Sequence, residues 1–307
     1  MSKLDPFEQQ PLEELPDTPD RPHPFDACEY YTIRLPFGSA GSIRSHVRKY
    51  GSGPPLLLVH GLMTSSYSWR YLLEPLGDHY ELFMPDLPGA GKSGKPDYAS
   101  YDPHALSDWL VALQRRLDIE SWPIVGNSLG GYIGMWLALH HPDAVERLVN
   151  LHSPGVPTLR LRALHAALSI PGSIRLLAWL ARRDPERWAH RHVHYWNETL
   201  KSREETSIYA EPLSNPPGSR AFAAHMRDAL DPAYLSRFVD ALERRRDEGE
   251  GFPVPLLLLY AERDPVVPPS IGEQLADLVP DAEYQTLERA SHFAHVERPD
   301  EVTGVLS

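Results

Sequence analysis

The sequence predicts an α/β fold, with a mostly parallel sheet, helices on both of its faces and an inserted helical lid. Short apolar runs alternate along the chain with longer amphipathic ones, which is typical of repeated strand–helix units. Most of these apolar runs are continuous, as expected of strands that are covered on both faces. Residues 155–252 break the rhythm, because they hold helical patterns and no apolar strand run. We interpret that segment as the lid.

Each predicted element follows from its local pattern. Residues 28–35 and 42–50 form two half-buried strands joined by a glycine-rich turn. The continuous apolar runs predict further strands at 54–60, 80–86, 121–127, 146–152 and 254–262. Helical patterns occupy 66–76, 104–118, 129–141 and 270–279. The α/β core therefore comprises residues 28–154 and 253–307, and the helical cap comprises 155–252.

Composition excludes several classes of protein. The formal net charge of −12 argues against nucleic-acid binding, which depends on Lys and Arg neutralising phosphates. The single cysteine, Cys28, excludes an internal disulfide and a cysteine-built metal site, and it fits a reducing compartment. No targeting segment is visible, and the apolar runs are too short to span a bilayer. We therefore expect a cytoplasmic protein without a membrane span; its oligomeric state stays open.

The two ends of the chain give weaker signals. Residues 1–27 are acidic and proline-rich, so we expect a flexible leader that cannot order itself alone. A leader that wraps on the domain surface is the alternative. At the other end, the last predicted helix is short.

A glycine-rich loop at residues 86–97, DLPGAGKSGKPD, resembles two nucleotide-binding patterns at once. The P-loop pattern needs a glycine where Asp86 stands, and a carboxylate there would repel phosphate. The dinucleotide pattern must open a helix, but two prolines follow Gly94. We therefore do not expect this loop to bind a nucleotide.

The strongest catalytic signal is the segment Gly126-Asn127-Ser128-Leu129-Gly130, which fits G-x-S-x-G. An apolar strand precedes it and an amphipathic helix follows it, which is the context that a nucleophile elbow requires. The flanking glycines allow a sharp turn that lifts the Ser128 hydroxyl above the sheet. Ser128 is therefore the predicted nucleophile.

A serine nucleophile needs a base, and the base needs an orienting acid, in the chain order Ser, acid, His. Asp264 comes just after the predicted strand 254–262, and His292 lies in a loop after the apolar-leaning run 282–290. We predict Asp264 as the acid and His292 as the base.

Two neighbours are alternatives. His295 could serve as the base, and Glu262 could serve as the acid, although Glu262 is more consistent with a strand end. The other position that can hold the acid, after the preceding strand, reads His152-Ser153 and offers no carboxylate. That absence favours Asp264.

An oxyanion hole requires backbone donors. The N–H of Leu129 follows the nucleophile, and the N–H of Leu62 comes from the loop after the strand 54–60. His60 and Gly61 are expected to shape this loop, with His60 in a structural role.

Taken together, these segments resemble the α/β-hydrolase superfamily, in its cap-bearing serine hydrolase branch. The resemblance covers residues 28–307 and rests on LLLVHGLMTSSYSWR, MPDLPGAGKSGKP, IVGNSLGGYIG, YAERDPVVP and SHFAHVERP, in family order. It implies that the loop at Asp86 fixes a tight turn after a strand. The segment HGLMTSSYSWR is similar to that of haloalkane dehalogenases and epoxide hydrolases, which use aspartate as nucleophile. Here the elbow holds Ser128, and the tryptophan that follows the dehalogenase nucleophile is replaced by Leu129.

The leading hypothesis is a carboxylesterase without a cofactor, acting on small-molecule esters with small to medium apolar acyl groups. The candidate substrate-binding residues, chosen as large side chains of the oxyanion loop and lid, are Met63, Tyr67, Trp69, Trp188 and Trp196.

Other readings stay open. The elbow also resembles that of C–C bond hydrolases of ring-cleavage products, whose anionic substrates would require a lid arginine in the pocket. The lid offers Arg160, Arg162, Arg175, Arg182, Arg183, Arg187 and Arg191. Acyltransferase and perhydrolase activity, or a non-turnover ligand receptor, are further alternatives. His190, His192 and His194 alternate along the lid, but this spacing does not converge on a helix, so we predict no metal site.

Overall fold

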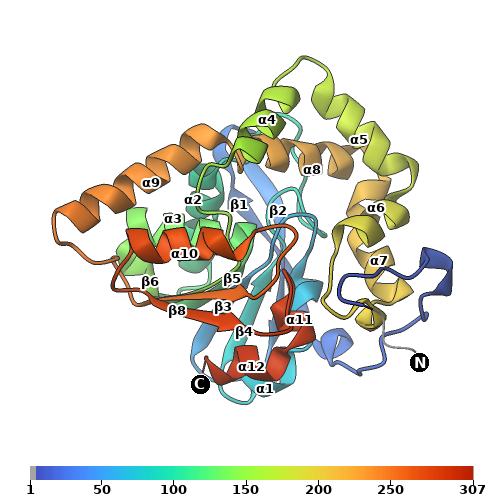
Figure 1. Ribbon diagram of the computed structural model, residues 1–307, viewed down its shortest axis with the longest axis horizontal. Helices are drawn as coiled ribbons and strands as arrows, with labels where there is room; N and C mark the ends of the chain where they lie inside the picture. The colour runs from blue at the N-terminus through green and yellow to red at the C-terminus, as the bar shows by residue number, and fades with distance from the viewer. Residues whose placement is uncertain (1–4, 307) are drawn as a thin grey trace.

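The computed structural model describes residues 5–306, which form an eight-stranded sheet in the order β1-β2-β4-β3-β5-β6-β7-β8 (Figure 1). Pairing is antiparallel between β1 and β2 and between β2 and β4, and parallel between all later neighbours. The strands are β1 (Glu29–Pro36), β2 (Ser42–Tyr50), β3 (Pro55–Val59), β4 (Glu81–Pro85), β5 (Trp122–Asn127), β6 (Val145–Leu151), β7 (Leu256–Ala261) and β8 (Glu283–Leu287). All seven predicted strands are present. The eighth, β8, is a half-exposed edge strand, which explains its weak apolar signal.

Helices cover both faces of the sheet, as predicted. On β3 the side chain of Leu57 faces one core, while Leu56 and Leu58 face the other, because successive side chains of a strand point to opposite faces. The first core is completed by α2 (Pro103–Arg116), α3 (Leu129–His140), α9 (Pro232–Asp247) and α10 (Pro269–Leu278). The second is completed by α1 (Leu73–Gly77), α11 (Ala294–Glu297) and α12 (Pro299–Gly304).

The segment between β6 and β7 is helical, as the missing strand pattern indicated. It contains α4 (Leu159–Leu168), α5 (Ser173–Arg183), α6 (Pro185–His192), α7 (Arg203–Ala210) and α8 (Pro216–Asp228), with short 3₁₀ turns η6 (Glu198–Leu200) and η7 (Glu211–Ser214). Polar N-cap side chains that accept a backbone N–H begin five of the helices, at Thr158, Asp184, Ser202, Asn215 and Asp231. The last helix of the predicted lid segment, α9, also packs on the core, since the ring centroids of Phe238 and Tyr132 of α3 are 5.3 Å apart.

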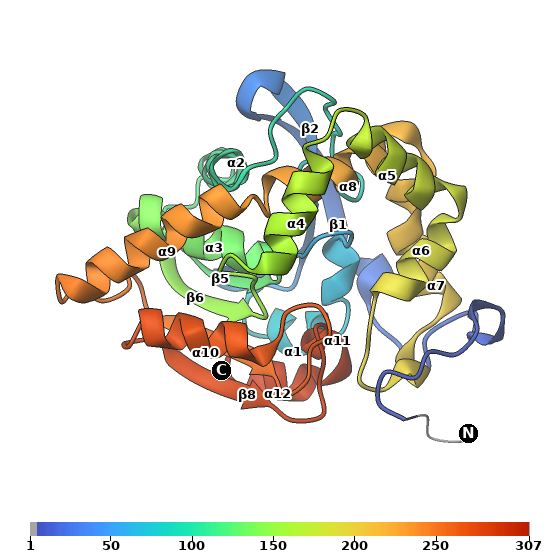
Figure 2. The same ribbon diagram turned by 45° about the horizontal axis from the view of Figure 1, so that its top comes forward.

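The α6–α7 half of the lid is joined to the core through buried polar groups. Tyr209 of α7 forms a hydrogen bond of 2.9 Å with Ser68, in the 3₁₀ turn η4 (Ser66–Trp69) that follows β3. Lys201 and Glu198, both buried, form an ion pair of 2.6 Å beneath α6. Figures 1 and 2 show α4 and α5 on the side of the lid that points away from the sheet.

The described part of the predicted leader, residues 5–27, wraps on the domain surface, which was the alternative to a flexible tail; residues 1–4 lie outside the described range. Its first part lies along the lid, whereas Arg21 donates to the Val296 carbonyl and Phe25 is buried in the second core. It forms two 3₁₀ turns, η1 (Leu12–Glu14) and η2 (Phe25–Ala27). The Phe7 N–H donates to the Trp196 carbonyl at 3.2 Å, and the Arg203 N–H donates to the Pro16 carbonyl at 2.8 Å. These main-chain bonds satisfy groups that the leader could not pair by itself.

No single helix within residues 5–306 is both long and apolar enough to cross a membrane. Among the described helices, only the pair α4 and α5 is long and apolar enough when the two are taken together. These two helices are bent by 100° relative to each other.

Candidate active site

Ser128 lies at a strained turn between β5 and α3. Its φ of 55° and ψ of −118° fall in a region that non-glycine residues rarely adopt. The turn is held by the Ser128 N–H, which donates to the Leu151 carbonyl at 2.7 Å. Glycine is needed beside it, because a Cβ at Gly130 would collide with the main chain of Val59 and His60. The local sequence thus folds as the elbow that the G-x-S-x-G pattern predicts.

Asp264 and His292 are brought together from the loops after β7 and β8. The Asp264 Oδ2 lies 2.6 Å from the His292 Nδ1, and both side chains are buried. The other carboxylate oxygen accepts the N–H groups of Val266 and Val267 at 2.7 and 2.9 Å. Burial acts to raise the pKa of Asp264, but the His292 ring and these N–H groups outweigh it, so that the pKa is lowered. Asp264 is therefore a carboxylate that can orient the imidazole.

The elbow is linked directly to the His292 loop. The side-chain amide of Asn127, next to Ser128, donates to the His292 carbonyl at 3.0 Å. Ser128 itself is only 9% exposed. The three predicted catalytic residues therefore lie at the carboxyl ends of β5, β7 and β8, where ligand sites of parallel sheets form.

The two alternatives to these residues lie in other surroundings. His295 packs on Trp69 with ring centroids 4.6 Å apart, and its ring nitrogens have no hydrogen-bond partner in the described chain. Burial holds the pKa of His295 well below its usual value, which makes it a neutral core group. Glu262 is exposed and accepts the Arg289 N–H at 3.3 Å, so it does not contact His292.

The predicted oxyanion donors flank the nucleophile. Gly61 lies so close that a Cβ there would be 3.0 Å from the Ser128 Cβ, and Leu62 follows it. Among the hydrogen bonds of residues 5–306, neither the Leu62 N–H nor the Leu129 N–H has an acceptor. Two free donors beside a serine hydroxyl are what a tetrahedral oxyanion requires.

His60 shapes the oxyanion loop. Its Nε2 accepts the Leu87 N–H at 3.0 Å, and its Nδ1 lies 2.8 Å from the Gly61 carbonyl. This pattern requires a proton on Nδ1 alone, so the ring is neutral. Complete burial lowers its pKa, which fits a structural group.

The glycine-rich loop that resembled a phosphate cradle is a tight turn around a buried carboxylate. Asp86 accepts the N–H groups of Ser66 and Lys92, both at 2.8 Å. Gly91 has a φ of 43°, and a Cβ there would collide with the Asp86 carboxylate. Asp86 thus joins this loop to the η4 turn behind the oxyanion loop.

A cavity of about 20 Å³ lies beside the oxyanion loop, little more than one water molecule needs. Leu62, Met63 and Leu129 line it from the core. The lid contributes Tyr209, Pro212, Leu213, Gly218, Phe222 and His225. Sequence reasoning missed these lid residues, because nothing in a helical pattern tells which face meets a cavity.

The other four predicted substrate-binding residues do not line this cavity. The Tyr67 hydroxyl donates to Glu204 at 2.7 Å, and Trp69 lies beneath the loop on His295. Trp188 stacks on His192 with centroids 4.6 Å apart. The ring of Trp196 packs against that of Phe7 in the leader, with ring centroids 5.8 Å apart. Of the five, Met63 alone lines the cavity.

His152 is a site residue whose role the sequence did not suggest. It follows β6 with a φ of 57°, is fully buried, and its ring lies 5.8 Å from the His292 ring. Neither ring nitrogen has a hydrogen-bond partner in the described chain. Burial lowers the pKa of His152 to about 3, so the ring is neutral beside the Asp264–His292 pair. Its position after a strand end was the only available signal.

The lid histidines do not converge. The His190 Nε2 is 2.9 Å from the Gln10 carbonyl, and the His192 Nδ1 is 2.7 Å from the Trp188 carbonyl. Within residues 5–306 no three His, Cys, Asp or Glu side chains are placed to hold a metal ion.

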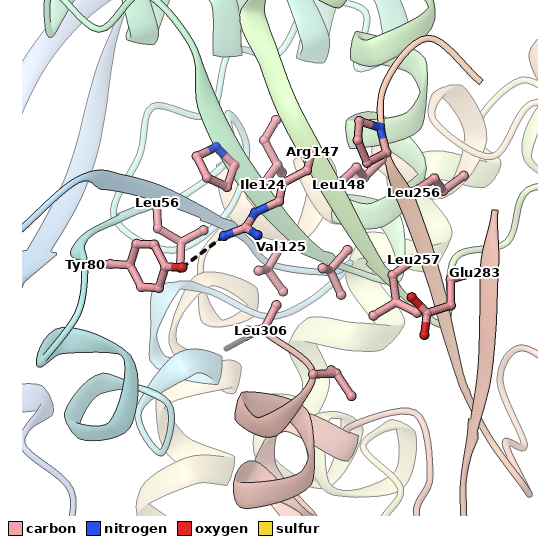
Figure 3. A pocket seen from close by; sticks show the side chains of 14 residues that line it. Leu56, Tyr80, Ile124, Val125, Arg147, Leu148, Leu256, Leu257, Glu283 and Leu306 are labelled. Carbon is pink, nitrogen blue, oxygen red and sulfur yellow. Dashed lines mark hydrogen bonds between the residues drawn. The ribbon is translucent and has the colours of Figure 1, made fainter. Parts of the chain in front are cut away.

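A larger hollow of about 160 Å³ lies at the opposite, amino ends of the strands (Figure 3). Its walls are apolar apart from Arg147, which donates to the Tyr80 hydroxyl at 3.0 Å, and Glu283. The predicted catalytic residues follow the carboxyl ends of β5, β7 and β8, so we place the candidate active site at that end of the sheet and not at this hollow.

The chain is similar to known hydrolases in sequence and in fold. Residues 54–299 match the family model described as alpha/beta hydrolase fold. The 2-hydroxymuconate semialdehyde hydrolase of Pseudomonas sp. (strain CF600) is 28% identical over 84% of this chain and 87% of its own. The 2-hydroxy-6-oxo-2,4-heptadienoate hydrolase of Pseudomonas putida is 25% identical over 84% of this chain and 90% of its own. Among solved structures, the haloalkane dehalogenase DatA of Agrobacterium tumefaciens C58 superposes with a TM-score of 0.72, at 22% identity, over 93% and 97% of the two chains.

Proposed function

Because the chain belongs to the α/β-hydrolase family, we propose that it is a serine hydrolase that cleaves carboxylic esters with small, uncharged acyl groups. In this proposal the Ser128 hydroxyl attacks the ester carbonyl while His292 takes its proton. Asp264 holds the imidazole in the required tautomer and stabilises the imidazolium. The Leu62 and Leu129 N–H groups bind the oxyanion, a contribution of about 10²–10³ in rate per donor. His292 then protonates the leaving alcohol and activates the water that releases the acid.

The observation that carries this proposal is the lining of the cavity beside the elbow. It contains no Arg, Lys, Asp or Glu, and its two histidines, His60 and His225, have lowered pKa values because they are buried. A carboxylate substrate in this cavity would lose its hydration without gaining a charged partner. An uncharged ester meets no such cost.

A C–C bond hydrolase is the second candidate, and the similarity to the two Pseudomonas hydrolases favours it, since both are named for substrates that are carboxylates. That reaction would require a cation near the elbow. None of the seven lid arginines lines the cavity, and the exposed Arg160, Arg162 and Arg175 belong to α4 and α5. We therefore rank it below ester hydrolysis.

The test is burst and steady-state kinetics on p-nitrophenyl acetate, butyrate and octanoate, with the Ser128→Ala variant as the matched control. We expect turnover in the wild type, a loss of at least about 10³-fold in the variant, and a preference for acetate. A 2-hydroxy-6-oxo-dienoate is assayed beside the esters.

Each alternative has its own signature in this assay. Turnover of the dienoate with no ester turnover would replace the proposal by C–C hydrolysis. A single burst without turnover would favour the receptor reading or an acyltransferase that lacks its acceptor.

A further inference from the structure

The corner formed by α4 and α5 exposes several large apolar side chains, which are rare on the rest of the described surface. Eight large hydrophobic side chains are exposed in residues 5–306, and five of them lie between residues 159 and 180. They are Leu159 (85% exposed), Ile170 (62%), Leu176 (57%), Trp179 (45%) and Leu180 (42%). Scattered exposed apolar side chains are normal, whereas their concentration in one helical segment is the feature from which we argue an interaction surface.

The pattern on α5 is that of an amphipathic helix turned outwards. Leu176, Trp179 and Leu180 have the helical spacing of one face and point to solvent, while Ala178 and Ala181 are buried against the lid. The small side chains thus pack inwards and the large ones face outwards. Arg175 and Arg183 flank the apolar stripe, and the Arg183 guanidinium lies 4.9 Å from the Trp179 ring.

The charge of this corner is opposite to that of the chain. Residues 153–183 hold five arginines, Arg160, Arg162, Arg175, Arg182 and Arg183, and no Asp or Glu, whereas the whole chain carries −12. No ion pair within the described residues involves any of these five arginines. Their charge is therefore free to meet an external anionic partner.

We propose that the α4–α5 corner docks on the surface of an anionic lipid bilayer. A helix with apolar Trp and Leu side chains bordered by arginines is the type that lies in the plane of a membrane interface. With 10 and 11 residues, neither α4 nor α5 is long enough to span a bilayer alone, and the two are bent by 100° relative to each other. We therefore place them on the surface in this proposal.

The alternative occupant, a second copy of the chain, fits the charges less well. A symmetric contact between two identical corners would place arginines of one copy against arginines of the other. An anionic lipid surface instead attracts every one of these arginines.

The position of the corner relates it to the candidate active site. In Figures 1 and 2, α5 runs beside α8, whose Phe222 and His225 line the cavity near the elbow. Docking at the corner would bring that cavity close to esters dissolved in a bilayer. The docking itself goes beyond the proposed reaction and does not depend on it.

The experiment measures cosedimentation of the Ser128→Ala protein with vesicles, so that no catalysis is needed. Vesicles of phosphatidylcholine alone are compared with vesicles containing about one-third phosphatidylglycerol, at low and high salt. We expect binding to the anionic vesicles only, weakened by salt. Trp179→Ser should reduce the partition constant by about tenfold, because it removes an aromatic side chain that docking would bury in the bilayer. The matched control is Tyr98→Ser, since Tyr98 is 95% exposed on the core, and it should have no effect.

A charge-matched pair separates the arginines from general electrostatics. Arg175→Gln/Arg183→Gln should weaken binding roughly tenfold, while Arg115→Gln/Arg116→Gln, at the exposed end of α2, should not. Equal binding by Trp179→Ser and Tyr98→Ser would overturn the proposal. So would a dimer that Trp179→Ser dissociates, without vesicle binding, in sedimentation equilibrium. Loss of esterase activity in the wild type leaves this binding assay unaffected, so the two proposals fail separately.

Discussion

Arg70 and Glu205 form a buried ion pair that joins the oxyanion-loop region to the lid. The Arg70 Nη2 lies 2.9 Å from the Glu205 Oε1, and the two side chains are 1% and 2% exposed. Arg70 directly follows η4, Glu205 belongs to α7, and the Tyr195 hydroxyl donates to the same carboxylate. Despite its burial, the pKa of Arg70 is raised, because Glu205 stabilises its charge. The position of the lid over the elbow therefore depends on a pair of charges without access to water.

Removing one member of this pair should be costly. Arg70→Met leaves the Glu205 carboxylate buried and unpaired, so we expect a loss of about 3–5 kcal/mol in the free energy of unfolding. Arg70→Met/Glu205→Leu removes both charges and should be less destabilised than Arg70→Met. Urea unfolding measures both, with the exposed pair Arg220–Asp97 as the control, where Arg220→Met should cost under about 1 kcal/mol. A double variant less stable than the single one would contradict this account.

The Asp264–His292 contact predicts a large kinetic effect with little structural change. Asp264→Asn keeps the size of the side chain but no longer fixes the imidazole tautomer or stabilises its charge. We expect kcat on p-nitrophenyl acetate to fall by about 10⁴. Glu262→Gln is the matched control, and its kcat should stay within about twofold, since Glu262 is exposed and apart from His292. Comparable losses in the two variants would mean that the acid has been misassigned.

His152 offers a way to test the geometry around the base. Its ring lies 5.8 Å from the His292 ring, and its φ of 57° is one that Asp tolerates better than most residues. We expect His152→Asp, added to Asp264→Asn, to recover roughly tenfold of the lost kcat by supplying a carboxylate from β6. His152→Asn in the same background supplies the shape without the charge and should recover nothing. Equal rates for the two double variants would show that the charge does not reach His292.

Glu297 should make stability depend on pH. Its carboxylate accepts the Ser291 N–H at 2.8 Å beside His292, and burial raises its pKa from 4.5 to about 7. The folded protein therefore binds this proton more tightly than the unfolded chain. The resulting stability is fully present below pH 4.5 and is lost as the pH rises through about 7, a change of about 3 kcal/mol.

Glu297→Gln tests this dependence, because an amide does not ionise. We expect the wild type to lose about 3 kcal/mol more than the variant between pH 4.5 and pH 8, as measured by denaturant unfolding at each pH. Parallel stability profiles for the two proteins would contradict the raised pKa.

Asp86 predicts a structural effect in a loop that looks functional. Asp86→Ala leaves the Ser66 N–H buried without an acceptor and also removes the bond to Lys92. We expect a loss of about 2–4 kcal/mol in unfolding free energy. Asp108→Ala, which removes a carboxylate that is 66% exposed, should cost under about 1 kcal/mol. Nucleotides should not raise the melting temperature of either protein in a thermal shift assay. A higher melting temperature with ATP would instead support nucleotide binding by this loop.

Much of this fold could be predicted because its signals are local. Runs such as residues 54–60 and 121–127 are buried on both faces, and their hydrophobicity is visible without knowing their partners. The elbow was predictable from its local pattern, since Gly126 is required by contacts with Gly130 and Gly131 in the same turn. Gly130 has a further, non-local reason, because a Cβ there would collide with the main chain of Val59 and His60.

What could not be predicted depends on contacts between distant segments. Arg70 and Glu205 are 135 positions apart in the sequence, and no local sequence pattern around either residue predicts their pairing. The contact of α9 with the core was equally invisible, because Phe238 of α9 and Tyr132 of α3 are far apart in the sequence. The leader was expected to be flexible from its composition, yet its main chain pairs with the lid at Trp196 and Arg203.

The two ends of the described chain, near residues 5 and 306, lie at different places on the molecule, and this determines how the protein can be attached to a surface or a reporter. The leader is bound to α6, since Gln9 donates to the His190 carbonyl and Arg187 pairs with Glu13. It is bound to α7 through the Arg203 N–H, which donates to the Pro16 carbonyl. Leu306 lies at the hollow on the opposite end of the sheet (Figures 1 and 3). Immobilisation through the amino terminus would restrain the lid, whereas immobilisation through the carboxyl terminus would leave it free. Because of the same contacts, a fluorophore on the leader would report on the position of the lid.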